Sequence, residues 1–143
     1  MNAVPAALAT AVVFIWLGMV LGISFLEAPL KFRAPGVDLR VGLGIGRIVF
    51  RALNLVEIGW ALVVLVAVVV GEPTGSVAAL TAVALVILAG QLVVVRLRLN
   101  RRTDRVLAGE DLPRSTMHLY YIGLEAAKVL VLAALGICLL VAG

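Results

Sequence analysis

Residues 48–70, which read IVFRALNLVEIGWALVVLVAVVV, decide the fold, because Arg51 and Glu57 are the only charged residues among them. A bilayer hydrocarbon core of ~30 Å needs ~20 helical residues at ~1.5 Å each, so this stretch is long enough to cross it. Three further apolar stretches of similar length lie at residues 4–25, 77–95 and 119–142. Since backbone groups in lipid must form their hydrogen bonds within the span, each stretch is predicted to be a helix. We therefore predict an all-α integral membrane four-helix bundle, a single domain over residues 1–143.

The composition excludes a water-soluble enzyme. Of 143 residues, 64% are hydrophobic and 14% are charged, whereas soluble domains are ~45–50% apolar and ~25% charged. A chain this apolar would expose large apolar patches in water, so the expected partner is the lipid bilayer. The net charge of +4 does not indicate nucleic acid as a partner, because the basic residues flank apolar spans. A single cysteine, Cys138, excludes an intramolecular disulfide and a Cys-cluster zinc site.

The basic residues predict the orientation of the helices. Apart from Lys128, every Lys and Arg lies in or beside one of the two long connections, near residues 31–51 or from Arg96 to Arg114. The link at residues 71–76, GEPTGS, has the residues of a short turn between the second and third helices. By the positive-inside rule, we expect both long connections in the cytoplasm and both termini outside the cell inner membrane. The stretch from Arg96 to Arg114 also suits contact with anionic lipid headgroups, although topology alone explains its charge.

The segment before the second helix has a different pattern. Between Pro35 and Arg47, apolar residues alternate with polar residues or glycines, which resembles a strand. Gly42, Gly44 and Gly46 weaken a strand, so we predict an interfacial loop or a re-entrant segment that leads into the second helix. These glycines do not indicate nucleotide binding, because the dinucleotide spacing and the lysine of a Walker loop are absent.

Polar residues inside the second and fourth spans are the strongest functional signal. Those of the second span follow at steps of four, three and three: Arg47, Arg51, Asn54 and Glu57. Those of the fourth span follow at steps of three, four and three: His118, Tyr121, Glu125 and Lys128. At ~100° per residue, each set occupies one side of its helix, within an arc of ~120° or less. Both faces are therefore predicted to point into the bundle.

The two polar faces also match in depth and charge. Counted at ~1.5 Å per residue from Arg47 and from His118, Glu57 and Lys128 both lie ~15 Å into the membrane. An isolated charge there costs at least ~2.5–3.5 kcal/mol, so opposite charges are expected to pair. We predict ion pairs of Glu57 with Lys128 and of Glu125 with Arg51, with the pairing open to permutation. Hydrogen bonds are expected from Asn54, Tyr121 and His118, and the secondary members of the site are Glu27, Lys31, Arg47 and Gln91.

A polar cluster of this kind fits two non-enzymatic functions. Ionisable groups inside a membrane mark sites that bind or pass a proton or small solute, and a charge-balanced cluster also holds helices together. No nucleophile turn accompanies His118, so a hydrolytic triad is not indicated. No metal site and no cofactor are predicted, because the chain has one His, one Cys and three Met. The alternative is a haem-binding redox protein with His118 as the axial ligand.

Gly18 and Gly22 suit either packing within the bundle or self-association into a homo-oligomer.

Several short segments carry a resemblance. They are SFLEAPLKF at 24–32, GIGR at 44–47, residues 54–57, and the late positions Ser115, His118, Tyr121, Glu125 and Lys128. In these segments the chain resembles small uncharacterised bacterial four-span integral membrane proteins, which are loosely similar to the copper-resistance D superfamily. The resemblance implies the four-helix topology. Some members of that superfamily handle haem or copper, but this sequence lacks the repeated His and Met residues expected of a metal handler.

Overall fold

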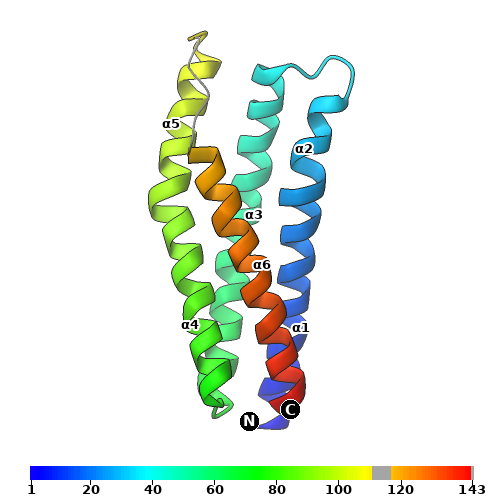
Figure 1. Cartoon of the computed structure of the whole chain (residues 1–143), viewed down its shortest axis with the longest axis vertical. Helices are drawn as coiled ribbons and strands as arrows, with labels where there is room; N and C mark the ends of the chain where they lie inside the picture. The colour runs from blue at the N-terminus through cyan, green and yellow to red at the C-terminus, as the bar shows by residue number, and fades with distance from the viewer. Residues whose placement is uncertain (111–116, 143) are drawn as a thin grey trace.

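The computed structural model describes residues 1–110 and 117–142, and within them the protein is helical. The first half contains α1 (Ala3–Val20), η1 (Leu21–Glu27), α2 (Ala28–Leu30), η2 (Lys31–Arg33) and α3 (Leu39–Val70). The second half contains α4 (Gly75–Gly90), η3 (Gln91–Val95), α5 (Arg96–Leu107) and α6 (Met117–Ala142). Successive elements join end to end into four long helices that pack side by side (Figure 1). The predicted all-α four-helix bundle is confirmed.

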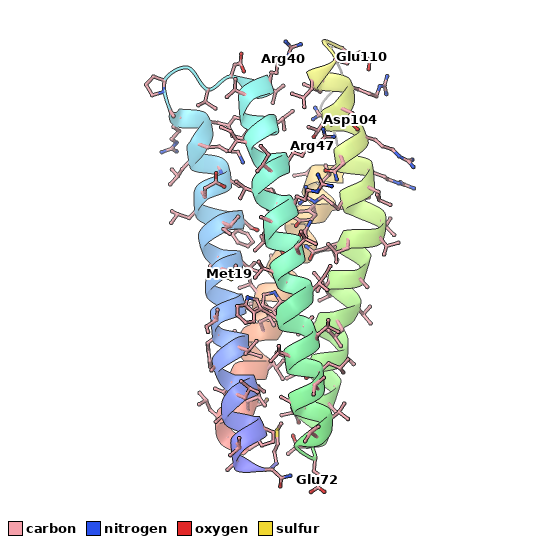
Figure 2. The ribbon with its side chains drawn as sticks, turned by 180° about the vertical axis from the view of Figure 1, so that it is seen from behind. Met19, Arg40, Arg47, Glu72, Asp104 and Glu110 are labelled. Atoms are coloured by element: carbon pink, nitrogen blue, oxygen red, sulfur yellow. The ribbon has the colours of Figure 1, made fainter. Side chains whose placement is uncertain are left out.

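All four helices are long and apolar enough to cross a membrane, which makes the chain a multi-pass membrane protein. They cover Ala3–Arg33, Leu39–Val70, Gly75–Leu107 and Leu119–Ala142. Both chain termini and the link before α4 lie at one end of the bundle, and the link before α3 and the end of α5 lie at the other (Figure 1). We call these the terminal end and the basic end, because Arg40 and Arg47 lie toward the latter, whereas Glu72 marks the former (Figure 2).

The prediction of a loop or re-entrant segment over residues 35–47 is wrong, because α3 already begins at Leu39. The carboxylate of Asp38 caps this helix by accepting a hydrogen bond of 2.8 Å from the backbone amide of Val41. Gly42 and Gly46 are four residues apart and therefore share one helix face, which packs against the end of the first helix. A Cβ atom on Gly42 would clash with the ring of Phe32. The glycines thus serve close helix packing inside a continuous helix.

An apolar core fills the bundle between the centre and the terminal end. Its large members come from all four long helices: Trp16, Val64, Val68, Leu88, Leu132, Leu135 and Leu139. Buried alanines such as Ala9, Ala61 and Ala84 let the helix backbones approach closely. Many Leu and Val side chains on the outer faces are exposed, for example Val66 and Leu130, as expected where lipid is the solvent.

Two of the long helices contain a π-helical segment. In the first helix, η1 (Leu21–Glu27) follows α1, and in the third helix η3 (Gln91–Val95) follows α4. Such segments are frequent at functional sites, because the wider turn changes the direction in which neighbouring side chains point. Here η1 contains Ser24 and η3 begins with Gln91, and both residues take part in the polar cluster described next.

Candidate functional site

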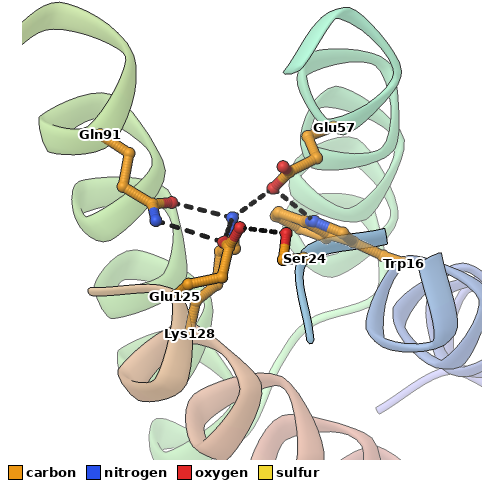
Figure 3. A network of polar contacts seen from close by, with 6 residues as sticks. All are labelled: Trp16, Ser24, Glu57, Gln91, Glu125 and Lys128. Atoms are coloured by element: carbon orange, nitrogen blue, oxygen red, sulfur yellow. Dashed lines mark hydrogen bonds and ion pairs between the residues drawn. The ribbon is translucent and has the colours of Figure 1, made fainter. Parts of the chain in front are cut away.

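A buried lysine is the centre of the polar cluster. The Nζ atom of Lys128 in α6 lies 2.5 Å from Oε2 of Glu57 and 2.5 Å from Oε1 of Glu125. It also donates a hydrogen bond of 2.8 Å to the side-chain oxygen of Gln91 (Figure 3). An ammonium group has three hydrogen-bond donors, so these three contacts use its full capacity. Lys128 and Glu57 are both 0% exposed, so water does not screen this interaction.

Three further hydrogen bonds surround the two carboxylates. The indole Nε1 of Trp16 donates to Oε2 of Glu57 at 3.0 Å, and the hydroxyl of Ser24 donates to Oε2 of Glu125 at 2.6 Å. The amide Nε2 of Gln91 donates to Oε1 of Glu125 at 3.2 Å (Figure 3). Together with Lys128, these residues form what we call the central network. It takes at least one side chain from each of the four long helices.

The central network contains more negative than positive charge. Two carboxylates, Glu57 and Glu125, share one ammonium group on Lys128. With all three ionised, the network carries a charge of about −1 in a region where an uncompensated charge costs several kcal/mol. In addition, Oε1 of Glu57 is buried and has no hydrogen-bond partner among the described residues. The network is therefore chemically suited to accept one more positive charge.

The structure contains one of the two predicted ion pairs. Glu57 and Lys128 are paired as predicted. The predicted pair of Glu125 with Arg51 is wrong, because Glu125 contacts Lys128 within the same helix and Arg51 is exposed. Arg51 lies six positions before Glu57 in α3, so the two side chains point ~120° apart around the helix axis. When Glu57 points into the bundle, Arg51 therefore points out of it. Asn54 is buried, but its side chain makes no hydrogen bond to another described residue.

The remaining predicted residues lie toward the basic end. Tyr121 is buried and packs edge-on against Phe50, with 5.8 Å between the ring centroids. Arg47 pairs with Asp104, and this contact connects α3 with α5 (Figure 2). Lys31 lies 3.9 Å from the carboxylate of Glu27, one turn away in the first helix. Among the described residues, no hydrogen bond or ion pair links these side chains to the central network.

His118 belongs to α6, but its side chain lies outside the described residues. The alternative of haem binding at His118 therefore stays a prediction. A visible absorption spectrum of the protein expressed with ample haem tests it. A Soret band that the His118→Ala variant loses would support it, and the absence of such a band would contradict it.

Three contributors to this region were missed in the sequence: Trp16, Ser24 and Arg96. Trp16 lies in mid-span, far from the interfaces where tryptophan is usual in membranes, and this position was the available signal. Ser24 is one of few polar residues in the first span, but its direction depends on the π-helical turn of η1. Arg96 lies in a run of arginines, and the sequence alone does not distinguish it from its neighbours.

A cavity of about 540 Å³ lies between the central network and the basic end. The ends of the first helix, α3, α5 and α6 surround it, and its walls include Ser24 and Glu125 of the network as well as the exposed residues Phe32 and Leu39. Most of its surface is apolar, and the basic residues that line it are Lys31, Arg47, Arg96 and Arg102. Of the charged side chains in the central network, that of Glu125 lines this cavity. Trp16 belongs to the apolar core.

Comparison of the chain with protein-family models, with curated proteins and with solved structures gave no match. The resemblance to bacterial four-span membrane proteins therefore stays a prediction.

Proposed function

We propose that this multi-pass membrane protein binds a proton at its central network and that the proton arrives through the cavity. The observation that supports this proposal is the sharing of one ammonium group by two buried carboxylates, one of which lines the cavity. Ion pairing alone would need only one carboxylate for Lys128. The second carboxylate supplies a group that becomes neutral when it takes up a proton.

The energetics favour proton uptake over a permanently charged network. A buried ionised carboxylate without full compensation either gains a proton or attracts a cation. Lys128, Gln91 and Ser24 fill the hydrogen-bonding positions around Glu125, which leaves little space for a metal ion. A proton needs no extra space, and Glu57 has an oxygen without a partner that can carry it.

We infer that the proton reaches the network from the basic end. The cavity reaches Ser24 and Glu125 from the basic end. On the terminal side, the buried side chains of Trp16, Leu132 and Leu135 belong to the apolar core, so the described residues form an apolar barrier there. We therefore propose proton binding from one side, with passage across the membrane requiring a different conformation.

The positive-inside rule assigns the side from which protons arrive. Arg40 and Arg47 lie toward the basic end (Figure 2), and Lys31, Arg47, Arg96 and Arg102 line the cavity. Under this rule, the basic end faces the cytoplasm of the cell inner membrane and both termini lie outside. The network would then exchange protons with the cytoplasm.

Labelling with the hydrophobic reagent dicyclohexylcarbodiimide tests the proposal, because it modifies protonated carboxyl groups in apolar surroundings. The protein is reconstituted in lipid nanodiscs, treated over a series of pH values, digested and analysed by mass spectrometry. We expect modification of Glu125 or Glu57 that decreases as the pH rises. We expect the Lys128→Met variant to remain labelled to higher pH, since the two carboxylates then lack a counter-charge and keep a proton more readily.

The Glu57→Gln and Glu125→Gln variants serve as controls, because each removes one reactive group and identifies the other. Labelling of neither glutamate at any pH, or labelling independent of pH, would overturn proton binding. The central network would then have the second function suggested by the sequence, that of holding the four helices together.

A further inference from the structure

Arg96 is held against aromatic rings at the wall of the cavity. Its guanidinium carbon lies 4.3 Å from the ring centroid of Tyr121 and 4.7 Å from that of Phe50. Cation–π contacts of this kind hold the guanidinium group in place beside the two rings. The buried Nε of Arg96 has no hydrogen-bond partner among the described residues. Arg96 is thus oriented in advance and retains unused donors.

The other cavity-lining cations divide into two groups. Lys31 and Arg47 have carboxylate partners in Glu27 and Asp104. Arg102 resembles Arg96, since its Nε is buried without a hydrogen-bond partner and it forms no ion pair with a described residue. Within residues 1–110 and 117–142, the cavity therefore has two guanidinium groups that no carboxylate compensates.

The acidic and neutral polar groups of the cavity do not offset the positive charge of these two guanidinium groups. Among the described residues, the one carboxylate that lines it is that of Glu125, which is already held by Lys128, Gln91 and Ser24. The buried hydroxyl of Tyr121, a residue 4% exposed, has no hydrogen-bond partner in the described part of the chain other than the neighbouring guanidinium group of Arg96. Among the described residues, positive charge therefore exceeds negative charge along the walls of the cavity.

The remaining walls are apolar and restrict the kind of anion that fits. The apolar residues that line the cavity include Phe25, Phe32, Leu43, Leu99 and Ile122. Its volume of about 540 Å³ lies within the ~300–1,000 Å³ typical of sites for single small molecules. A small inorganic anion would leave these walls uncovered. We propose that the cavity binds an organic carboxylate with an apolar body, such as a single-chain fatty acid, with the carboxylate on Arg96 and the chain against the apolar walls.

This inference goes beyond proton binding and does not require it. The anion site depends on Arg96, Arg102 and Tyr121, whereas proton binding depends on Glu57, Glu125 and Lys128. Binding of a carboxylate and carbodiimide labelling are separate measurements, so either proposal can fail while the other holds.

Equilibrium binding of tritiated laurate to the full-length protein in nanodiscs tests the proposal, with empty nanodiscs subtracting partition into lipid. We expect saturable binding that methyl laurate, which has the same chain without the charge, does not displace. Hydrogen bonds to a charged group contribute enough that Arg96→Gln should weaken binding by about tenfold or more. Arg101→Gln is the matched control, because Arg101 lies on the same helix, is exposed and does not line the cavity.

A second variant keeps the test informative if Arg96→Gln disturbs folding. Tyr121→Phe keeps the ring that supports Arg96 and removes only the hydroxyl, and we expect it to weaken laurate binding several-fold. Equal binding by Arg96→Gln and Arg101→Gln, or equal competition by laurate and methyl laurate, would overturn the proposal. Preference for dodecyl phosphate over laurate would assign the site to phosphate headgroups and overturn the choice of a carboxylate.

Discussion

Lys128 is the residue on which the charge balance of the bundle depends. Its single ammonium group lies 2.5 Å from a carboxylate oxygen of Glu57 and 2.5 Å from one of Glu125, with all three side chains at most 1% exposed. A buried ion pair is a modest source of stability when complete, but removal of one partner leaves an unpaired charge in the apolar interior. The consequence of losing this lysine should therefore greatly exceed that of losing a surface cation.

We expect Lys128→Met to lower the free energy of unfolding by about 3–5 kcal/mol. The measurement is reversible unfolding in mixed micelles, followed by circular dichroism. Adding Glu125→Gln to Lys128→Met should restore part of the loss, because one of the two uncompensated carboxylates is then neutral. Arg105→Met is the control, since Arg105 pairs with Glu110 on the surface and should change stability by at most about 1 kcal/mol. Equal effects of Lys128→Met and Arg105→Met would show that the charge on Lys128 does not hold the network.

The residues of the network were predictable to the extent that helical spacing determines direction. The steps between polar residues in the second and fourth spans correctly place Glu57 opposite Lys128. The same reasoning assigned Arg51 to Glu125, because the arc of ~120° was treated as one face, although its edge points out of the bundle. The contact of Glu125 with Lys128 one turn along its own helix is the shorter route to neutralisation.

The helices are held together at the terminal end by a tight contact between α1 and the link that follows α3. The backbone amide of Asn2 donates a hydrogen bond of 2.9 Å to the carbonyl of Gly71. Gly71 has no room for a side chain, because a Cβ atom there would lie 2.8 Å from the carbonyl oxygen of Ala67 and 2.9 Å from Cβ of Pro5. The absence of a side chain at Gly71 thus fixes how closely the two elements approach.

We expect Gly71→Ala to lower the free energy of unfolding by about 1–3 kcal/mol through this overlap. Gly59→Ala is the matched control, because Gly59 lies within α3 with nothing within 4 Å of its Cβ position. Alanine favours the helix there, so that variant should be neutral or more stable by up to about 1 kcal/mol. Thermal unfolding of both variants in the same detergent distinguishes them, and an equal change in the two would contradict the proposed contact.

At the level of elements, hydropathy located the helices but not their ends. The apolar stretches 4–25 and 77–95 are the most apolar parts of longer helices, which run over Ala3–Arg33 and Gly75–Leu107. The additional turns are polar or basic, so a hydropathy pattern ends before the helix does. The π-helical segments η1 and η3 were not predictable, because they depend on how the packed helices satisfy Glu125 through Ser24 and Gln91.

The molecule as a whole is polarised along its long axis. Arg40, Arg47 and the cavity lie toward one end (Figure 2), and both termini (Figure 1) and the acidic Glu72 (Figure 2) lie at the other. Because of this polarity, the orientation of the bundle determines from which side of the membrane protons would reach the central network. It also makes the orientation measurable, because exposed positions are present at both ends.

We expect a membrane-impermeant maleimide to label Ser76→Cys in intact cells and to label Arg40→Cys only after lysis. Both positions are exposed and lie at opposite ends of the bundle. Both substitutions are made in a Cys138→Ser background, which removes the free cysteine. Gel-shift analysis of the labelled protein reads the result. The reverse labelling pattern would place the basic end outside the cell and contradict the orientation expected from the positive-inside rule.

The position of Lys128 in α6 determines when, during synthesis of the chain, the buried carboxylate of Glu57 gains its ammonium partner. Ribosomes synthesise the chain from its N-terminus, so Glu57 and Gln91 enter the membrane before the lysine that contacts them has been translated. Until α6 inserts, these two side chains lack their ammonium partner and the nascent bundle is incomplete in charge as well as in packing. Insertion of α6 therefore brings in one step both the fourth long helix of the bundle and the ammonium group that contacts the two carboxylates.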